Sequence, residues 1–292
     1  MEETRFEIEG RDGASIACYR WQGDEPPRAV VQVAHGMGEH ALRYPAALEP
    51  LTQQGFVLYA NDHRGHGRTA PDAAALGDYG PGGYDIVVDD MARLTDRAAA
   101  DNPGLPIFFL GHSMGSMLGQ GYLIHHAAKL AGAALSGSAA IDQLVQIAAH
   151  PEGLGALNAP FAPGRTGFEW LSRDEAEVDL YVADPLCGFG LTPESMMSLF
   201  GQAQRLAEPE TLKRIPAGFP VYIFAGAEDP VNARGAWIAP LIERYTAAGL
   251  DVTARLYAGA RHEVLNETNR AEVVGDLIDW LEKTLWRVEG AR

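Results

Sequence analysis

The chain has 292 residues, of which 47% are hydrophobic and 21% charged, a composition typical of a folded protein with a large core. Its 23 lysines and arginines stand against 39 aspartates and glutamates, and the resulting net charge of -16 would repel polyanions, so we expect no nucleic-acid partner. The first residues, MEETRFEIEGRDG, are acidic where a secretory signal is basic, and no long apolar run follows, which predicts a cytoplasmic chain without a spanning helix.

The N-terminal half begins with an alternating pattern, from Phe6 to Trp21, that predicts an antiparallel hairpin at a sheet edge. Six apolar or β-branched runs then follow, most of them ending at or near a glycine, and such runs are typical of buried parallel strands. They are Ala29 to Gly36, Gly55 to Asp62, Pro106 to Gly111, Gly132 to Ser138, Pro220 to Gly226 and Asp251 to Gly259. The pattern predicts an α/β fold with a doubly wound, mostly parallel sheet.

Helical periodicity separates these runs, which places helices on both faces of the sheet. The predicted helices are Ile86 to Ala100, Ser116 to Ala131, Arg234 to Ala248 and Arg270 to Trp286. The alternation stops between the fourth and fifth runs, where apolar, helix-like pieces occur without a strand. We therefore predict an α/β core over residues 1–138 and 216–292, with an inserted helical cap over residues 139–215.

The strongest local signal is GHSMG, from Gly111 to Gly115, because a strand run precedes it and a helical run follows it. This context is typical of a nucleophile elbow, a sharp turn that exposes the hydroxyl of Ser113 above the sheet and needs glycines for room. A serine hydroxyl is a weak nucleophile at neutral pH, so it requires a general base and a group that orients this base.

The order serine, acid, histidine predicts where these partners lie. Asp229 follows a late strand run in GAEDPV, with Glu228 as the competing carboxylate, and His262 stands in a loop before the terminal helix. The other eight histidines precede the acid, and we expect them to be structural or exposed. The glycine-flanked loop AHGMGEH follows a buried strand, and backbone N–H groups there and after Ser113, those of Met37 and Met114, could bind an oxyanion.

No metal or cofactor is expected from the sequence. His63 and His66 lie three residues apart but lack further ligands and stand among arginines, so they are interpreted as part of a packed loop. The two cysteines, Cys18 and Cys187, lie far apart without metal-ligand spacing and are predicted to be buried thiols.

Several motifs in the same order resemble the monoacylglycerol lipase and lysophospholipase branch of the α/β-hydrolases, a group classed near the serine aminopeptidases. They cover nearly the whole chain: HGMGEHALRY, DHRGHGRT, GHSMG, LSRDEAEVDLYVADPL, GAEDPVN and GARHEVLNE. The resemblance implies a Ser113, Asp229 and His262 triad, an oxyanion hole at Met37 and Met114, and a short apolar cap that guides an acyl chain. Met37 departs from the small residue that the branch often carries, and its side chain is expected to narrow the acyl site.

The sequence thus predicts a serine hydrolase that cleaves a monoacylglycerol or a related small acyl ester. A lysophospholipase is the nearest alternative, followed by an aminopeptidase, a perhydrolase and a non-catalytic ligand-binding protein. The serine argues against epoxide hydrolases and dehalogenases, which need a carboxylate at the elbow. A monomer or weak homodimer is expected, with transient lipid contact through the cap. The predicted substrate contacts are Gly36, Leu144, Ile147, Leu157, Phe161 and Met197.

Overall fold

The computed structural model describes residues 1–148 and 153–290. Its framework is a single sheet of eight strands in the order β1-β2-β4-β3-β5-β6-β7-β8. The strands are β1 (Glu2–Glu9), β2 (Ser15–Gln22), β3 (Ala29–Ala34), β4 (Phe56–Asn61), β5 (Ile107–His112), β6 (Gly132–Ser136), β7 (Pro220–Gly226) and β8 (Asp251–Tyr257). All six predicted parallel runs form strands, and the expected N-terminal hairpin pairs antiparallel at one edge, so the predicted fold class is confirmed.

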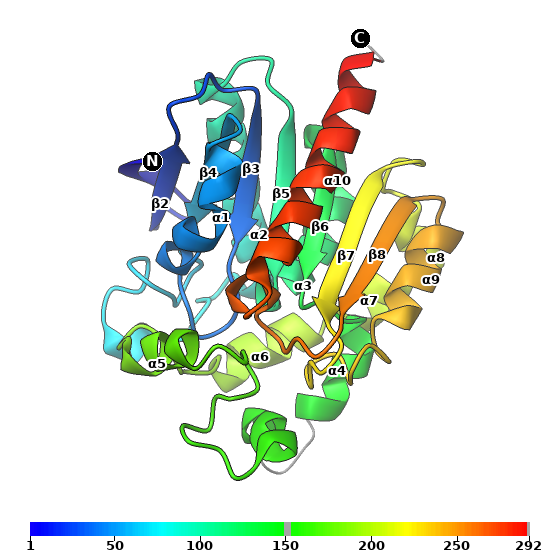
Figure 1. Ribbon diagram of the computed structural model, residues 1–292. Coiled ribbons are helices and arrows are strands. Elements are labelled where there is room, and N and C mark those ends of the chain that lie inside the picture. The colour runs from blue at the N-terminus through cyan, green and yellow to red at the C-terminus, as the bar shows by residue number, and fades with distance from the viewer. Residues whose placement is uncertain (149–152, 291–292) are drawn as a thin grey trace.

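Helices cover both faces of the sheet (Figure 1). On one face, α1 (Pro45–Thr52) and α10 (Arg270–Gly290) pack on Phe108, Phe224 and their neighbours. On the other face lie α2 (Gly83–Asp101), α3 (Met114–His126) and α9 (Ala239–Ala247). The central strands β3 to β6 are buried along their whole length, which explains their apolar sequences.

The predicted helix from Arg234 to Ala248 begins later than expected, at Ala239. Ala233, Arg234 and Gly235 have positive φ angles of 52°, 55° and 88°, and such residues cannot continue a right-handed helix. This segment forms successive turns instead. The turns follow Asp229 directly, so they shape the surroundings of one of the predicted site residues.

Between β6 and β7 the chain forms short helices, and the described residues of this stretch contain no strand. They are α4 (Ile141–Ala148), the 3-10 helix Gly153–Phe161, α5 (Glu175–Ala183), α6 (Pro193–Phe200), α7 (Ala203–Ala207) and α8 (Pro209–Leu212). Figure 1 shows α4, α5 and α6 beyond the ends to which the parallel strands point. Ligands of open α/β sheets bind at these carboxyl ends, so this segment lies where a substrate would enter.

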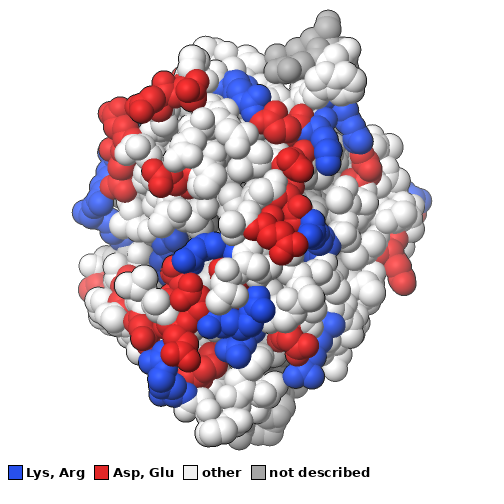
Figure 2. Space-filling model, viewed as in Figure 1, with Lys and Arg blue, Asp and Glu red and all other residues white. Residues whose placement is uncertain are grey.

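Acidic and basic side chains are interspersed over the face viewed in Figure 2, where they form no continuous basic surface. The ion pairs include Arg255 with Glu272 and Asp276, and Arg287 with Asp251. Every helix among the described residues is too short or too polar to span a lipid bilayer.

Candidate active site

Ser113 occupies the turn between β5 and α3, with a φ of 51° and a ψ of -121°. A non-glycine residue rarely adopts this conformation, and such strain is typical of a nucleophile elbow. Neighbouring backbone holds the turn: the Ser113 N–H donates to the Ser136 carbonyl at 2.9 Å, and the Ser116 N–H donates to the Ser113 carbonyl at 2.8 Å. The serine is therefore fixed at the carboxyl end of the sheet, as the GHSMG motif predicts.

The two glycines of the motif allow backbone segments to pack closely around the turn. A Cβ on Gly115 would lie 2.1 Å from the carbonyl oxygen of Ala34, and one on Gly111 would lie 2.6 Å from that of Gly115. Across the site, a Cβ on Gly36 would lie 3.2 Å from the Cβ of Ser113. The loop after β3 and the elbow are thus in direct contact, which only small residues allow.

His262 and Asp229 meet in the buried interior beside this turn. The distance between His262 Nδ1 and Asp229 Oδ2 is 2.9 Å, and both residues are almost completely buried. The Asp229 carboxylate also accepts hydrogen bonds from the Val231 N–H at 2.8 Å and from Asn232 Nδ2 at 2.7 Å. Glu228, the competing carboxylate, pairs instead with Arg234 on the surface.

The protonation of His262 is set by opposing effects. Burial lowers its pKa, but the charge and hydrogen bond of Asp229, together with the charges of Glu263 and Glu39, raise the pKa above its ordinary value overall. The neighbouring imidazole of His112 behaves oppositely, because burial and the charge of His262 lower its pKa to about 4. Of these two neighbouring imidazoles, His262 is therefore the more basic.

An ionic network under the loop after β3 was not anticipated from the sequence. The buried carboxylate of Glu39 accepts hydrogen bonds from the Gly36 N–H at 2.6 Å and the Tyr44 hydroxyl at 2.7 Å. Arg43 donates to Glu39 at 2.6 Å and to both carboxylate oxygens of Glu263 at 2.6 and 2.8 Å. Burial opposes ionisation of Glu39, but the charge of Arg43 holds its pKa well below the usual range. The network ties the loop of Met37 to the residue after His262.

A cavity of about 330 Å³ opens over these groups. Ser113, His262, Gly36, Met37 and Met114 all line it. Most of its remaining wall is apolar and comes from residues between 139 and 215, including Leu144, Leu157, Phe168, Trp170, Leu199 and Phe200. Its size and apolar lining are typical of a small-molecule site.

The predicted substrate contacts divide into three groups. Gly36, Leu144 and Leu157 line the cavity, whereas the side chain of Ile147 lies outside the described residues. The structure does not place Phe161 or Met197 in the cavity wall: the guanidinium of Arg261 lies 4.3 Å from the ring of Phe161, and Met197 is 68% exposed. Phe168 and Trp170, which the sequence did not single out, take part in the wall, and the Trp170 ring lies 5.1 Å from that of His262.

The histidines of the DHRGHG motif form a packed cluster, as expected. His35, His63 and His66 are fully buried, with ring centres 4.2 and 5.2 Å from that of His35. Burial lowers the pKa of His35 to about 4 and that of His66 to about 3, so the cluster is neutral at physiological pH. Both cysteines are free thiols, but only Cys18 is buried; Cys187 is partly exposed, which corrects the expectation of two buried thiols.

Comparison with known proteins supports one family throughout. The model of the family described as serine aminopeptidase, S33, matches residues 25–269. The chain is 32% identical to the monoacylglycerol lipase of Mycolicibacterium smegmatis, covering 96% of this chain and 98% of that protein. It is 30% identical to the human monoglyceride lipase, covering 88% of this chain and 82% of that protein.

Among solved structures, a highly thermostable carboxyl esterase from Bacillus coagulans, determined in complex with glycerol, aligns with a TM-score of 0.87 at 28% identity. The alignment covers 98% of this chain and 99% of that one. Family model, curated relatives and fold all agree with the motifs in the sequence. The chain therefore belongs to the serine aminopeptidase S33 family of α/β-hydrolases and, within it, to the branch of the monoacylglycerol lipases.

Proposed function

We propose that this chain, a serine ester hydrolase, cleaves monoacylglycerols through a triad of Ser113, His262 and Asp229. The observation that carries the proposal is the buried pairing of His262 Nδ1 with Asp229, at 2.9 Å, together with the position of His262 in the wall of the cavity that Ser113 also lines. An imidazole held in this way by a carboxylate has its other nitrogen available to accept a proton from the hydroxyl of a nucleophilic serine. The carboxylate then stabilises the charged imidazolium.

The reaction proceeds in two steps. Ser113 Oγ attacks the ester carbonyl while His262 accepts the hydroxyl proton, and the proton then passes to the departing glycerol oxygen as the acyl-enzyme forms. Water, deprotonated by His262, attacks the acyl-enzyme; the bond between the acyl carbon and Ser113 Oγ breaks, His262 returns the proton to Ser113 Oγ, and the fatty acid is released. The backbone N–H groups of Met37 and Met114 stabilise the oxyanion in both steps. Support for this role is that both residues line the cavity and that Met114 is the first residue of α3, where N–H groups lack helical partners.

The segment of residues 139–215 acts as a cap over this site. Its support is the apolar wall that Leu144, Leu157 and Phe168 contribute to the cavity that Ser113 and His262 also line. Exposed apolar side chains on its outer surface, Leu180 at 66% and Met197 at 68%, would serve transient contact with a lipid surface. Flotation of the protein with phosphatidylcholine vesicles tests this lipid contact.

The sequence leads us to expect a monomer or a weak homodimer. Analytical ultracentrifugation tests this oligomeric state.

The charged groups near the cavity favour a neutral ester over the alternatives. An aminopeptidase needs a free carboxylate for the substrate amine, but Glu39 and Glu263 are both engaged by Arg43. A lysophospholipase would benefit from a cationic side chain that binds the phosphate of its substrate. None of the described residues that line the cavity is a lysine or arginine. A glycerol leaving group requires neither charge.

The test is hydrolysis of 1-monoacylglycerols with acyl chains of increasing length, compared with matched p-nitrophenyl esters, lysophosphatidylcholines and aminoacyl anilides. We expect glycerol release to exceed glycerophosphocholine release and to depend on Ser113. Met37 lines the cavity, so we also expect a preference for short or medium chains that Met37→Ala shifts toward longer ones. Greater release of glycerophosphocholine, or of the aniline, would reverse the assignment of substrate.

A further inference from the structure

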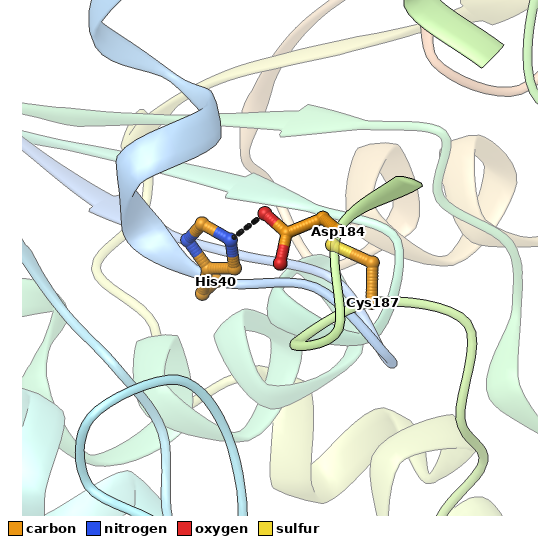
Figure 3. Close-up of side chains that lie close together, drawn as sticks. All are labelled: His40, Asp184 and Cys187. Atoms are coloured by element: carbon orange, nitrogen blue, oxygen red, sulfur yellow. Dashed lines mark hydrogen bonds and ion pairs between the residues drawn. The ribbon is translucent and has the colours of Figure 1, made fainter. Parts of the chain in front are cut away.

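Three side chains with metal-binding atoms converge outside the proposed triad (Figure 3). His40 lies in the loop after β3, and Asp184 and Cys187 lie just after α5 in the 139–215 segment. The distance between His40 Nε2 and Asp184 Oδ2 is 2.9 Å, and one ligand atom from each of the three residues lies within 4.8 Å of the other two. Residues far apart in the sequence thus meet at one point between the core and this segment.

The set of donor atoms matches the preferences of zinc. Zinc binds imidazole nitrogen, carboxylate oxygen and thiolate sulfur in tetrahedral geometry, at about 2.0 to 2.3 Å. Ligand atoms at such distances are about 3.4 to 3.6 Å apart. The three ligand atoms, which lie within 4.8 Å of one another, are thus near this spacing, and on binding the hydrogen bond between His40 and Asp184 would be replaced by two metal bonds.

The surroundings of the cluster also favour a cation. Among the described residues, the charged groups with the largest effect on Cys187 are the carboxylates of Glu39, Asp184 and Glu263 and the guanidinium of Arg43. Arg43 is itself engaged by Glu39 and Glu263. With the thiol neutral, the local charge is negative, and a divalent cation would balance it.

We propose that His40, Asp184 and Cys187 form a zinc-binding site that fastens the 139–215 segment to the loop carrying Met37. Zinc displaces the thiol proton of Cys187, which passes to solvent, and coordinates neutral His40, the Asp184 carboxylate and one water; no oxidation is involved. The site lies beside an existing contact, since the Gly188 N–H donates to the Gly38 carbonyl at 3.0 Å. It differs from the expectation of no metal drawn from the sequence, because its ligands are brought together only by the fold.

The consequence of the proposal is a stability effect at the cavity wall. Gly188, Phe189 and Gly190 follow Cys187 directly and line the cavity. A metal bound only by the folded chain stabilises that state, and at a hundredfold excess over its dissociation constant the melting temperature should rise by about 5 to 10 °C. Magnesium, which prefers oxygen ligands, should give no such rise.

The experiment measures metal binding on the purified full chain, independently of ester hydrolysis. Zinc titrations followed by thermal unfolding are compared for the wild type, Cys187→Ser and His40→Gln, with Cys18→Ser as the matched control because Cys18 is the other free thiol. Cobalt titrations of the same proteins report a thiolate-to-metal charge-transfer absorption.

We expect a zinc-dependent rise in melting temperature and a cobalt–thiolate band in the wild type and in Cys18→Ser, and the loss of both in Cys187→Ser. The apparent affinity of His40→Gln for zinc should be at least tenfold lower than that of the wild type. The proposal is overturned by no zinc effect in the wild type, or by an effect of equal size in Cys187→Ser. Because binding is read without substrate, either result is separate from the fate of the proposed esterase activity.

Discussion

The replacement of Gly115 by alanine tests whether the close packing behind Ser113 maintains the site. Gly115 lies at the start of α3, and a Cβ placed there would be 2.1 Å from the Ala34 carbonyl oxygen and 2.6 Å from that of His35. Ordinary Cβ contacts are at least about 3.4 Å, so β3 and α3 would have to separate by about 1 Å. Neither contact atom belongs to a flexible side chain that could move aside.

The separation would act on both halves of the site at once. Ser113 immediately precedes α3, whereas Met37 follows β3, so the added methyl group would move the nucleophile away from the proposed oxyanion-binding loop. A displacement of about 1 Å at a reacting group lowers the rate about 100-fold. Overpacking of this kind also destabilises the fold by about 1 to 3 kcal/mol.

The assay combines ester hydrolysis with urea unfolding, and Gly275→Ala is the matched control. Gly275 also lies inside a helix, α10, but a Cβ there would have no heavy atom within 4 Å. This control should keep its activity and gain up to about 1 kcal/mol of stability, because alanine is the better helix former. A Gly115→Ala variant with unchanged kcat/KM and stability would show that the packing argument is wrong.

Three further predictions concern protonation and the cavity. Because His262 must be neutral to accept a proton and its pKa is raised, activity should increase with pH through a midpoint above 6.5. Glu263→Gln removes a negative charge that helps to raise this pKa, so a pH–rate profile should show the midpoint at a lower pH, and an unchanged midpoint would contradict this. The buried imidazoles of His35 and His112 have pKa values lowered to about 4, so their contribution to stability is complete above pH 6.5 and is lost as the pH falls toward 4. The free energy of unfolding in urea should therefore be lower at pH 5 than at pH 7 by about 2 kcal/mol for each of these residues. A free energy of unfolding that does not change with pH would refute this. Leu144→Trp should fill the cavity and reduce kcat/KM for longer acyl chains at least tenfold, whereas Val145→Trp, at a 41% exposed neighbour, should leave the chain-length profile unchanged.

Much of the fold was predictable because the signals are local. A buried parallel strand is apolar along its length, so runs such as the one over Ala29–Ala34 identify themselves. The elbow was predictable for the same reason, since strand, glycine, serine and helix are adjacent in the sequence. The start of α9 was missed because the positive φ angles of Ala233 and Arg234 are imposed by the turns around them and have no glycine signal of their own.

The surroundings of the site could not be read from the sequence because they depend on distant contacts. Arg43 and Glu263 are 220 positions apart, and no local pattern indicates that they pair. Apolar periodicity shows that a helix has a buried face, but not which cavity that face adjoins. Met197 therefore looked like a substrate contact and is exposed, whereas Trp170, in an irregular stretch, lies beside His262.

The most direct test of the proposed mechanism is labelling of the active protein with a fluorophosphonate, read by intact mass and peptide mapping. The account predicts one adduct per chain, located on Ser113, formed in parallel with the loss of ester hydrolysis and absent from Ser113→Ala. An adduct on another residue, or ester hydrolysis retained by Ser113→Ala, would contradict it.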